Sequence, residues 1–180
     1  MWASSKYYAV VDRDLSHLLA EEKLLTCHGL DNLSKYVQPA SIDLPLSDDC
    51  YLVKDRVLPY GRKLRDLIPS LEISRVSLGE TGAVLLKGQT YLALCGRVRM
   101  PRHLRGSLSP KSSIGRVDLM VRGVLDGCGL YDTVANGEEG ELWMEITPRS
   151  FNVRVKVGQA LSQMMVFTSE LSSRMDPTYL

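Results

Sequence analysis

The 180-residue chain lacks the features that mark several large classes of protein. No apolar run approaches the roughly 20 residues that a membrane-spanning helix needs. The N-terminus lacks the long apolar stretch of a secretory signal. The formal net charge is only +1, so no global field attracts nucleic acid or a membrane surface. A local cluster of cations for a nucleoside triphosphate is still compatible with this composition, and the length suits one folded domain.

Cysteine and histidine are scarce, and their spacing does not indicate a metal site. The chain has four cysteines and three histidines, with no C-x-x-C pair. Cys27 and His28 are adjacent, which is too close for the usual ligand spacing of structural zinc. A disulfide framework is not expected at this size, so we expect reduced thiols, a cytoplasmic location and no zinc.

Helical periodicity is confined to the beginning of the chain. Residues 12–25 (DRDLSHLLAEEKLL) predict one helix, with Asp12 or Asp14 as its cap and Leu15, Leu18 and Leu19 at helical spacing. From about residue 37 the segments are short, β-branched or aromatic and separated by Gly, Pro or Asp; examples are CYLVK, GAVLLK, TYLALCGRVRM and FNVRVKV. No helical pattern lies between these segments, which argues against parallel βαβ units.

The sequence therefore predicts an all-β barrel or jelly-roll-like body with a short N-terminal helix. We expect a single domain in which residues 1–36 form the N-terminal helical segment and residues 37–168 form the β body. Residues 169–180 (SELSSRMDPTYL) are short and polar, and we expect a mobile tail.

The segment S-P-K-S-S-I-G-R, at positions 109–116, is the first candidate site. It combines two cations and three hydroxyls with a glycine that permits close backbone approach. Hydroxyls, backbone N–H groups and a cation commonly hold phosphate oxygens. A solvated basic turn between two strands explains the same composition, and the spacing is not that of a Walker A loop.

A second candidate is G-E-L-W-M-E-I, at positions 140–146. In a strand, Leu142, Met144 and Ile146 share one face, which we expect to be core. Glu145 then lies beside Trp143 on the other face. A carboxylate that is partly desolvated by an indole has a raised pKa, which suits a general base. The alternative is an ordinary solvent-facing glutamate paired with Arg149 or Arg154.

With Q-P-A-S-I-D-L, at positions 38–44, these segments resemble the dCTP deaminase family of the dUTPase-like superfamily. The resemblance begins at D-R-D-L, at position 12, ends at L-S-Q-M-M-V-F, at position 161, and keeps the family order. It is closest to the first half of a double-length bacterial form. The resemblance implies a distorted jelly roll or barrel of the dUTPase-like (β-clip) type.

The resemblance also implies roles for individual residues at the reacting carbon. Glu145 matches the carboxylate that activates the attacking water. Ser112 matches the hydroxyl that helps to hold this water, and Arg116 matches the arginine that orients the carboxylate. Leu125 matches the position whose backbone carbonyl faces the water.

Other residues are implied to hold the nucleotide. Lys111 stands where the family usually has arginine, which keeps the charge but loses bidentate geometry. With Ser113 it would contact the triphosphate, and Gln163 resembles a glutamine near the bound nucleotide. The resemblance implies dCTP or dUTP as ligand, Mg²⁺ carried by the triphosphate, and a homotrimer with active sites between subunits.

The implied reaction needs no metal at the reacting carbon. Water adds at C4 of cytosine, N3 is protonated and ammonia leaves, so one glutamate can accept and return the proton. Zinc deaminases carry H-x-E and P-C-x-x-C signatures, and both are missing from this sequence.

Two departures from the family pattern leave alternatives open. The region 126–140 is longer than usual and contains Asp126 and Asp132, either of which could activate water against the α-phosphate. Release of dUMP and diphosphate is therefore an alternative, whereas turn capping is the structural explanation for both aspartates. The family's C-terminal lid is not recognisable in residues 169–180. A nucleotide-binding or trimer-forming subunit without catalysis is the third hypothesis.

Overall fold

The computed structural model describes residues 8–21, 23–27, 29 and 32–168. Within these residues the strands form two main antiparallel sheets and a two-stranded ribbon of β6 (Ala83–Leu85) and β12 (Val153–Val155). The mostly β fold with a few short helices confirms the predicted fold class. No helix among the described residues has the length and apolar character needed to cross a membrane. The mobility expected for residues 169–180 concerns a segment outside the described residues.

The larger sheet carries Glu145 on an interior strand, β11. Its order is β5-β4-β7-β11-β9, and β1 pairs with the far end of β7. The strands are β1 (Leu25–Thr26), β4 (Cys50–Val53), β5 (Glu72–Val76), β7 (Thr90–Arg99), β9 (Leu119–Leu125) and β11 (Glu139–Pro148).

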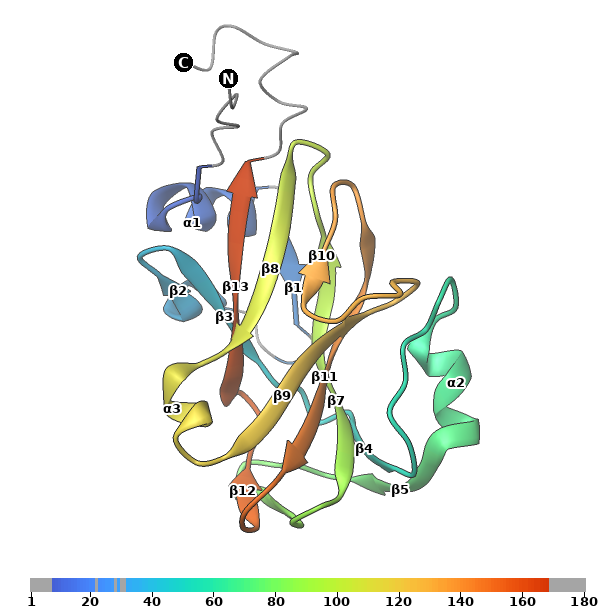
Figure 1. Cartoon of the computed structure of the whole chain (residues 1–180). Helices are drawn as coiled ribbons and strands as arrows, with labels where there is room; N and C mark the ends of the chain where they lie inside the picture. Colours follow the sequence, from blue (N-terminus) through green and yellow to red (C-terminus); the bar gives the residue numbers. More distant parts are fainter. Residues whose placement is uncertain (1–7, 22, 28, 30–31, 169–180) are drawn as a thin grey trace, which may run out of the picture.

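The second sheet has the order β10-β8-β13-β3-β2 and lies across the core from the first (Figure 1). Its strands are β2 (Val37–Gln38), β3 (Ser41–Pro45), β8 (Leu104–Pro110), β10 (Thr133–Val134) and β13 (Ala160–Thr168). The predicted segments CYLVK, GAVLLK, TYLALCGRVRM and FNVRVKV each contain a strand, as their composition indicates.

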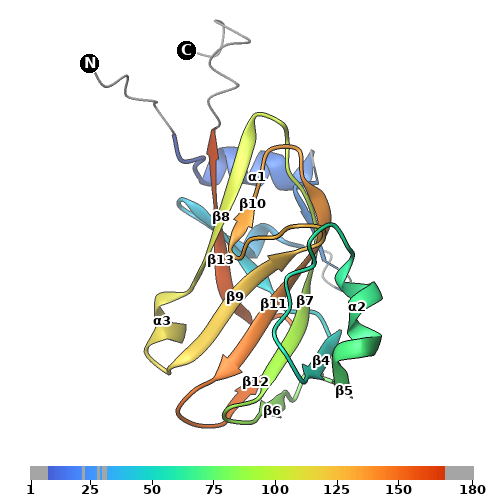
Figure 2. The same ribbon diagram turned by 45° about the vertical axis from the view of Figure 1, so that its right-hand side comes forward.

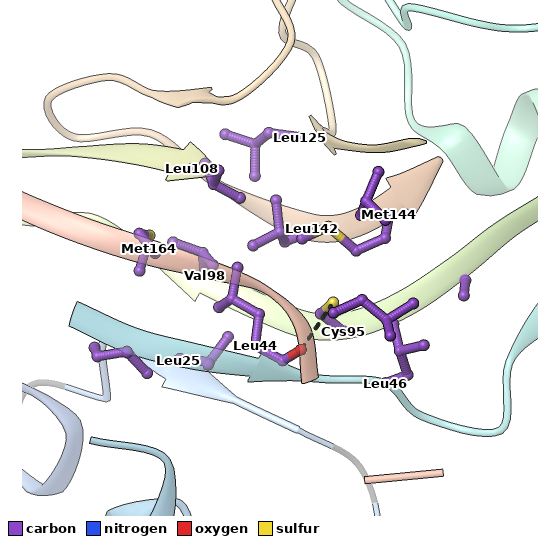
Figure 3. Packing of buried hydrophobic residues seen from close by; sticks show 14 of the residues in the cluster. Leu25, Leu44, Leu46, Cys95, Val98, Leu108, Leu125, Leu142, Met144 and Met164 are labelled. Atoms are coloured by element: carbon purple, nitrogen blue, oxygen red, sulfur yellow. Dashed lines mark hydrogen bonds between the residues drawn. The ribbon is translucent and has the colours of Figure 1, made fainter. Parts of the chain in front are cut away.

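The main core fills the space between the two sheets. Figure 3 shows Leu44 of β3 and Met164 of β13 facing Leu142 and Met144 of β11. The polar contact of the Cys95 thiol is a long one, 4.0 Å to the carbonyl oxygen of Leu44. Because a thiol is a weak donor, Cys95 packs here as a small apolar side chain. Burying these residues removes apolar surface from water and holds the sheets together.

The N-terminal helix is shorter than predicted. α1 spans Asp12–Ala20 and buries Leu15 and Leu18 against the core, as expected from their spacing. It does not reach residue 25, because Lys23 has a φ of 52° and Leu25 instead pairs with Val98 in β1. The predicted cap was also wrong, since Val11 occupies the N-cap without a side-chain hydrogen bond.

The other helices lie at opposite sides of the sandwich. In Figures 1 and 2, α3 (Ser112–Gly115) follows β8 on one side, and α2 (Leu64–Leu71) lies on the other. A short 3₁₀ turn spans Ser34–Tyr36. α2 was not predicted from the sequence, and it contains Pro69. The helix buries Leu64 and Ile68, one turn apart, in a second apolar cluster with Trp143 on the outer face of the larger sheet.

A bulge in β7 lets both of its ends contribute to the core. Leu142 pairs with Gly96 and Trp143 pairs with Leu94, so Cys95 is the extra residue. Cys95 and Val98 therefore both face the core although they are three positions apart. β1 pairs with β7 next to this point, and a methyl group at Gly96 would lie 2.2 Å from the carbonyl oxygen of Thr26.

We therefore expect Gly96→Ala to destabilise the protein by about 3 kcal/mol, because the clash is with backbone that cannot rotate away. Gly115→Ala is the control, since its added methyl would meet nothing within 4 Å. That variant should change the free energy of unfolding by less than about 0.5 kcal/mol. The midpoints of urea denaturation measure both effects, and equal midpoints for the two variants would contradict the expectation.

Candidate active site

Glu145 lies in the middle of β11, between β7 and β9. It pairs with Leu92 on one side and Arg122 on the other. Leu142, Met144 and Ile146 face the main core, as the strand period predicts. Glu145 points to the outer face and is only 1% exposed, so it is not an ordinary solvent-facing carboxylate.

The two oxygens of Glu145 have different surroundings. The Tyr131 hydroxyl donates a hydrogen bond of 3.0 Å to Oε2. Oε1 accepts no hydrogen bond from the described residues, and the Arg56 Nε lies 3.5 Å from it. Burial raises the pKa of Glu145 above its usual value, while the Tyr131 hydrogen bond and the Arg56 charge oppose this rise. The pKa of this carboxylate is therefore raised, which is the direction that favours a general base at neutral pH.

Asp132 is anchored to β9 rather than free in its loop. Arg122 Nε donates to Oδ2, and the Gly123 amide donates to Oδ1 at 2.6 Å. The Arg122 guanidinium also lies 4.6 Å from the centre of the Tyr131 ring. One arginine therefore contacts both Asp132 and the tyrosine that binds Glu145.

Asp126 connects α2 with the larger sheet. Its Oδ1 accepts from the Leu64 amide at 2.8 Å, and its Oδ2 accepts from the Glu141 amide at 3.1 Å. The first bond satisfies an N–H group in the first turn of α2 that has no partner within the helix. This structural role differs from the turn capping weighed from the sequence, because the bonds reach a helix distant in the chain and the backbone of β11. Leu125 is buried at the end of β9, and its carbonyl accepts from the Cys128 amide at 3.1 Å.

The serine-rich segment forms a corner between β8 and α3. Lys111 is the N-cap of α3, and Ser112, Ser113 and Arg116 are exposed. The Lys111 ammonium forms an ion pair with Asp43 of β3, which is 5% exposed. The lysine charge is therefore directed at the smaller sheet, whereas the hydroxyls and the arginine face outward.

Gln163 belongs to the same corner. It lies on β13 between Asp43 and Ser109. The Ser41 hydroxyl donates to its Oε1 at 3.2 Å, and its Nε2 donates to the Ser109 hydroxyl at 3.4 Å. We call Ser41, Asp43, Ser109, Lys111 and Gln163 the lysine cluster.

The predicted site residues thus fall into two groups within one subunit. Glu145, Asp126, Asp132 and Leu125 lie on β9, β11 and the loop between them, whereas the others gather at the lysine cluster and α3. No ion pair or hydrogen bond joins these groups in the described part of the chain. In particular, Glu145 pairs with Arg56 and not with Arg116.

Three contacts of Glu145 were not predicted from the sequence. Arg122 could have been found from strand pairing, since β9 and β11 are neighbours and it lies directly opposite Glu145. Tyr131 carried a weaker signal as the residue before Asp132. Arg56 carried none, because its position depends on the path of the loop between β4 and α2. That loop also brings Arg56 to within 3.6 Å of the Met120 sulfur.

Across the described ranges, no three His, Cys, Asp or Glu side chains gather as metal ligands would. The four cysteines are free thiols, and all but Cys27 are buried. Burial raises the pKa of the Cys27 and Cys50 thiols to about 12, so both are protonated and unreactive at neutral pH.

Comparison with known proteins places this antiparallel β fold among the nucleotide deaminases. The sequence model of the 2'-deoxycytidine 5'-triphosphate deaminase (DCD) N-terminal domain matches residues 9–170. The chain therefore belongs to the dCTP deaminase family. This confirms the resemblance on which the residue assignments were based. No curated protein sequence matches the chain.

A solved structure agrees with this assignment. The crystal structure of 2'-deoxycytidine 5'-triphosphate deaminase from Agrobacterium tumefaciens is similar, with a TM-score of 0.84 and 31% sequence identity. The match covers 91% of this chain and 49% of that chain. The chain thus spans about half the length of that protein, in keeping with the predicted likeness to one half of a double-length form.

The raised pKa of Glu145 predicts a pH-dependent stability. The folded state holds this proton to a higher pH than the unfolded chain, where the value is about 4.5. Ionising Glu145 therefore costs stability, and the cost grows as the pH rises from about 4.5 through the folded-state pKa. We expect the free energy of unfolding of Glu145→Gln, relative to the wild type, to increase across this window in urea titrations.

Glu139→Gln on the same strand is the control. A hydrogen bond from Arg97 lowers the pKa of Glu139, so its ionised form is favoured in the folded state. That variant should lose stability relative to the wild type as the pH rises toward about 4.5, and the difference should stay nearly constant above this value, where the Glu145 effect develops. A pH-independent difference between Glu145→Gln and the wild type would show that burial does not perturb Glu145.

Proposed function

We propose that the chain hydrolyses dCTP to dUTP and ammonia, with Glu145 as the general base. The observation that carries this proposal is a carboxylate with a raised pKa, buried on an inner strand, with one oxygen held by Tyr131. Glu145 removes a proton from water as the water oxygen bonds to C4 of cytosine. The proton passes to N3, a second transfer protonates the amine, and ammonia leaves.

The exposed corner at α3 supplies the nucleotide contacts of the proposal. Ser112 holds the attacking water, Arg116 orients the carboxylate and the Leu125 carbonyl faces the water. Lys111 and Ser113 hold the triphosphate, which enters as its Mg²⁺ complex, and Gln163 lies near the nucleotide. The Lys111 ammonium must exchange Asp43 for phosphate or bind both, because the ion pair occupies it in the free protein.

The proposed assembly is a homotrimer with each site between two subunits. The separation of Glu145 from the exposed residues of α3 supports this assembly. Within one subunit the proposed base and the proposed nucleotide-binding residues are apart, so a neighbouring subunit must bring them together. The reduced state of all four thiols is compatible with the cytoplasmic location that we propose.

Deamination alone is favoured over the bifunctional reaction by the state of the two aspartates. Both oxygens of Asp126 already accept backbone N–H groups. Both oxygens of Asp132 accept hydrogen bonds from β9. A base that activates water against the α-phosphate would have to break or share these bonds, so release of dUMP and diphosphate is the less supported alternative.

Product analysis tests the reaction directly. The protein is incubated with dCTP and Mg²⁺, and the nucleotides are separated by chromatography. We expect dUTP and ammonia. Appearance of dUMP and diphosphate would establish the bifunctional reaction. Nucleotide binding without turnover would contradict catalysis and favour a non-catalytic subunit, a role compatible with the near-complete burial of Glu145.

Substitution of the base tests its identity. Glu145→Gln should lower kcat for dCTP by about 10²- to 10⁴-fold, the usual contribution of general acid–base catalysis, with dCTP binding retained. Glu139→Gln is the matched control, since Glu139 lies on the same strand but is exposed and paired with Arg97. Full activity in Glu145→Gln would show that another group acts as the base.

Mixed assemblies test the interfacial site. Glu145→Gln and Ser112→Ala should each be inactive alone. After subunit exchange at equal amounts, about a quarter of the sites combine an intact Glu145 with an intact Ser112 of the neighbour, so about a quarter of wild-type activity should return. If mixed trimers form by native mass spectrometry but stay inactive, the two residues do not share a site across the interface.

A further inference from the structure

Glu145 has two oxygens, and only one of them is engaged by a hydrogen bond. Oε2 accepts from the Tyr131 hydroxyl, whereas Oε1 is buried without a hydrogen-bond partner among the described residues. The Arg56 Nε lies 3.5 Å from Oε1, so it stabilises the charge without occupying the oxygen in a good hydrogen bond. A buried acceptor without a hydrogen bond lowers the stability of the folded state, and a donor such as water would satisfy it.

Tyr131 is built to act as a donor at this place. Burial and the charge of Glu145 raise the pKa of its hydroxyl to about 12, so it keeps its proton at neutral pH. Its ring lies against the Arg122 guanidinium, which is itself bonded to Asp132. The Gly123 amide fixes the other oxygen of Asp132, so the residue next to Tyr131 is tied to β9.

We propose that Tyr131 is a positioning residue, which binds Oε2 of Glu145 and thereby reserves Oε1 to take the proton from the attacking water. This role rests on the proposed function of Glu145 as the base. In this role Tyr131 leaves Oε1 as the oxygen that accepts the proton, so the attacking water must approach Glu145 from the side of Oε1. The hydrogen bond also favours the ionised carboxylate, which limits the effect of burial and keeps the base deprotonated over a wider pH range.

Other groups around Glu145 also affect its pKa, and the test must distinguish their effect from that of Tyr131. Arg56 reaches it from the loop before α2, and Arg122 lies opposite it on β9. Both charges lower its pKa, as do the hydrogen bond from Tyr131 and a backbone hydrogen bond from Val57. On β7 the facing residue is Leu92, which is apolar. Removing only the Tyr131 hydroxyl leaves both arginines in place, so the change is specific.

The test is Tyr131→Phe, read out first by carbon NMR of the Glu145 carboxyl group. We expect the pKa of Glu145 to rise, because the variant loses a hydrogen bond that favours the charged form. In dCTP deamination, kcat should fall by about tenfold to a hundredfold, with KM changed by less than about twofold. The acidic limb of the pH profile of kcat should move to higher pH.

Tyr51→Phe is the matched control. The Tyr51 hydroxyl also donates to a carboxylate, at 2.7 Å to Asp49, and its ring centre lies 6.2 Å from that of Trp143. This variant should leave both the titration of Glu145 and the pH profile unchanged. If Tyr131→Phe left the titration unchanged, or if Tyr51→Phe shifted it equally, the positioning role would be overturned.

The wild-type protein provides a second measurement that does not depend on the variant folding. The ring carbon bonded to the Tyr131 hydroxyl should show a small shift step at the pH where Glu145 titrates, and Glu145→Gln should abolish the step. Its absence in the wild type would overturn the hydrogen bond itself. A shifted Glu145 titration in Tyr131→Phe, with no deamination by the wild type, would instead reject the proposed function and support the contact.

Discussion

The site depends on the removal of one carboxylate from water. Glu145 is almost fully buried, and burial is the largest influence on its pKa. Tyr131 and two arginines stabilise the ionised carboxylate and so offset part of the effect of burial, but the pKa of Glu145 stays above its usual value. The arrangement costs stability when Glu145 is ionised. Such a cost is characteristic of functional sites, because a base with a pKa nearer neutrality transfers protons more effectively at neutral pH.

That burial is produced by a segment outside the sheet itself. The loop after β4 and α2 cover the outer face of the larger sheet, where Leu64 and Ile68 pack with Trp143 beside the strand position of Glu145. Asp126 connects α2 to the sheet, because one of its oxygens accepts a hydrogen bond from the Leu64 amide and the other accepts one from the backbone of β11. A residue considered from the sequence as a group that activates water therefore supports the surroundings of Glu145 instead.

Strand periodicity made the orientation of Glu145 predictable, because alternate side chains point to opposite faces and Leu142, Met144 and Ile146 had to face the core. The repeated short strands likewise predicted the fold class. The α1 helix was predicted too long because Leu24 and Leu25 continue its apolar pattern. In the structure Leu25 belongs to β1, which pairs with β7. Pro69 obscured α2. Contacts such as that of Arg56 depend on a loop path that no local pattern encodes.

The division of the predicted residues between two faces gives the subunit and the assembly different tasks under the proposed function. Packing within one subunit sets the protonation of Glu145, through burial and Tyr131. Among the described residues no hydrogen bond joins the exposed hydroxyls of α3 to Glu145, and the nearby Lys111 charge is balanced by Asp43. In the proposed trimer, one subunit holds the carboxylate in place and the neighbouring subunit supplies the contacts that bring cytosine to Oε1. Under this proposal, folding of the subunit sets the pKa of Glu145, and association of subunits completes the binding site for the substrate.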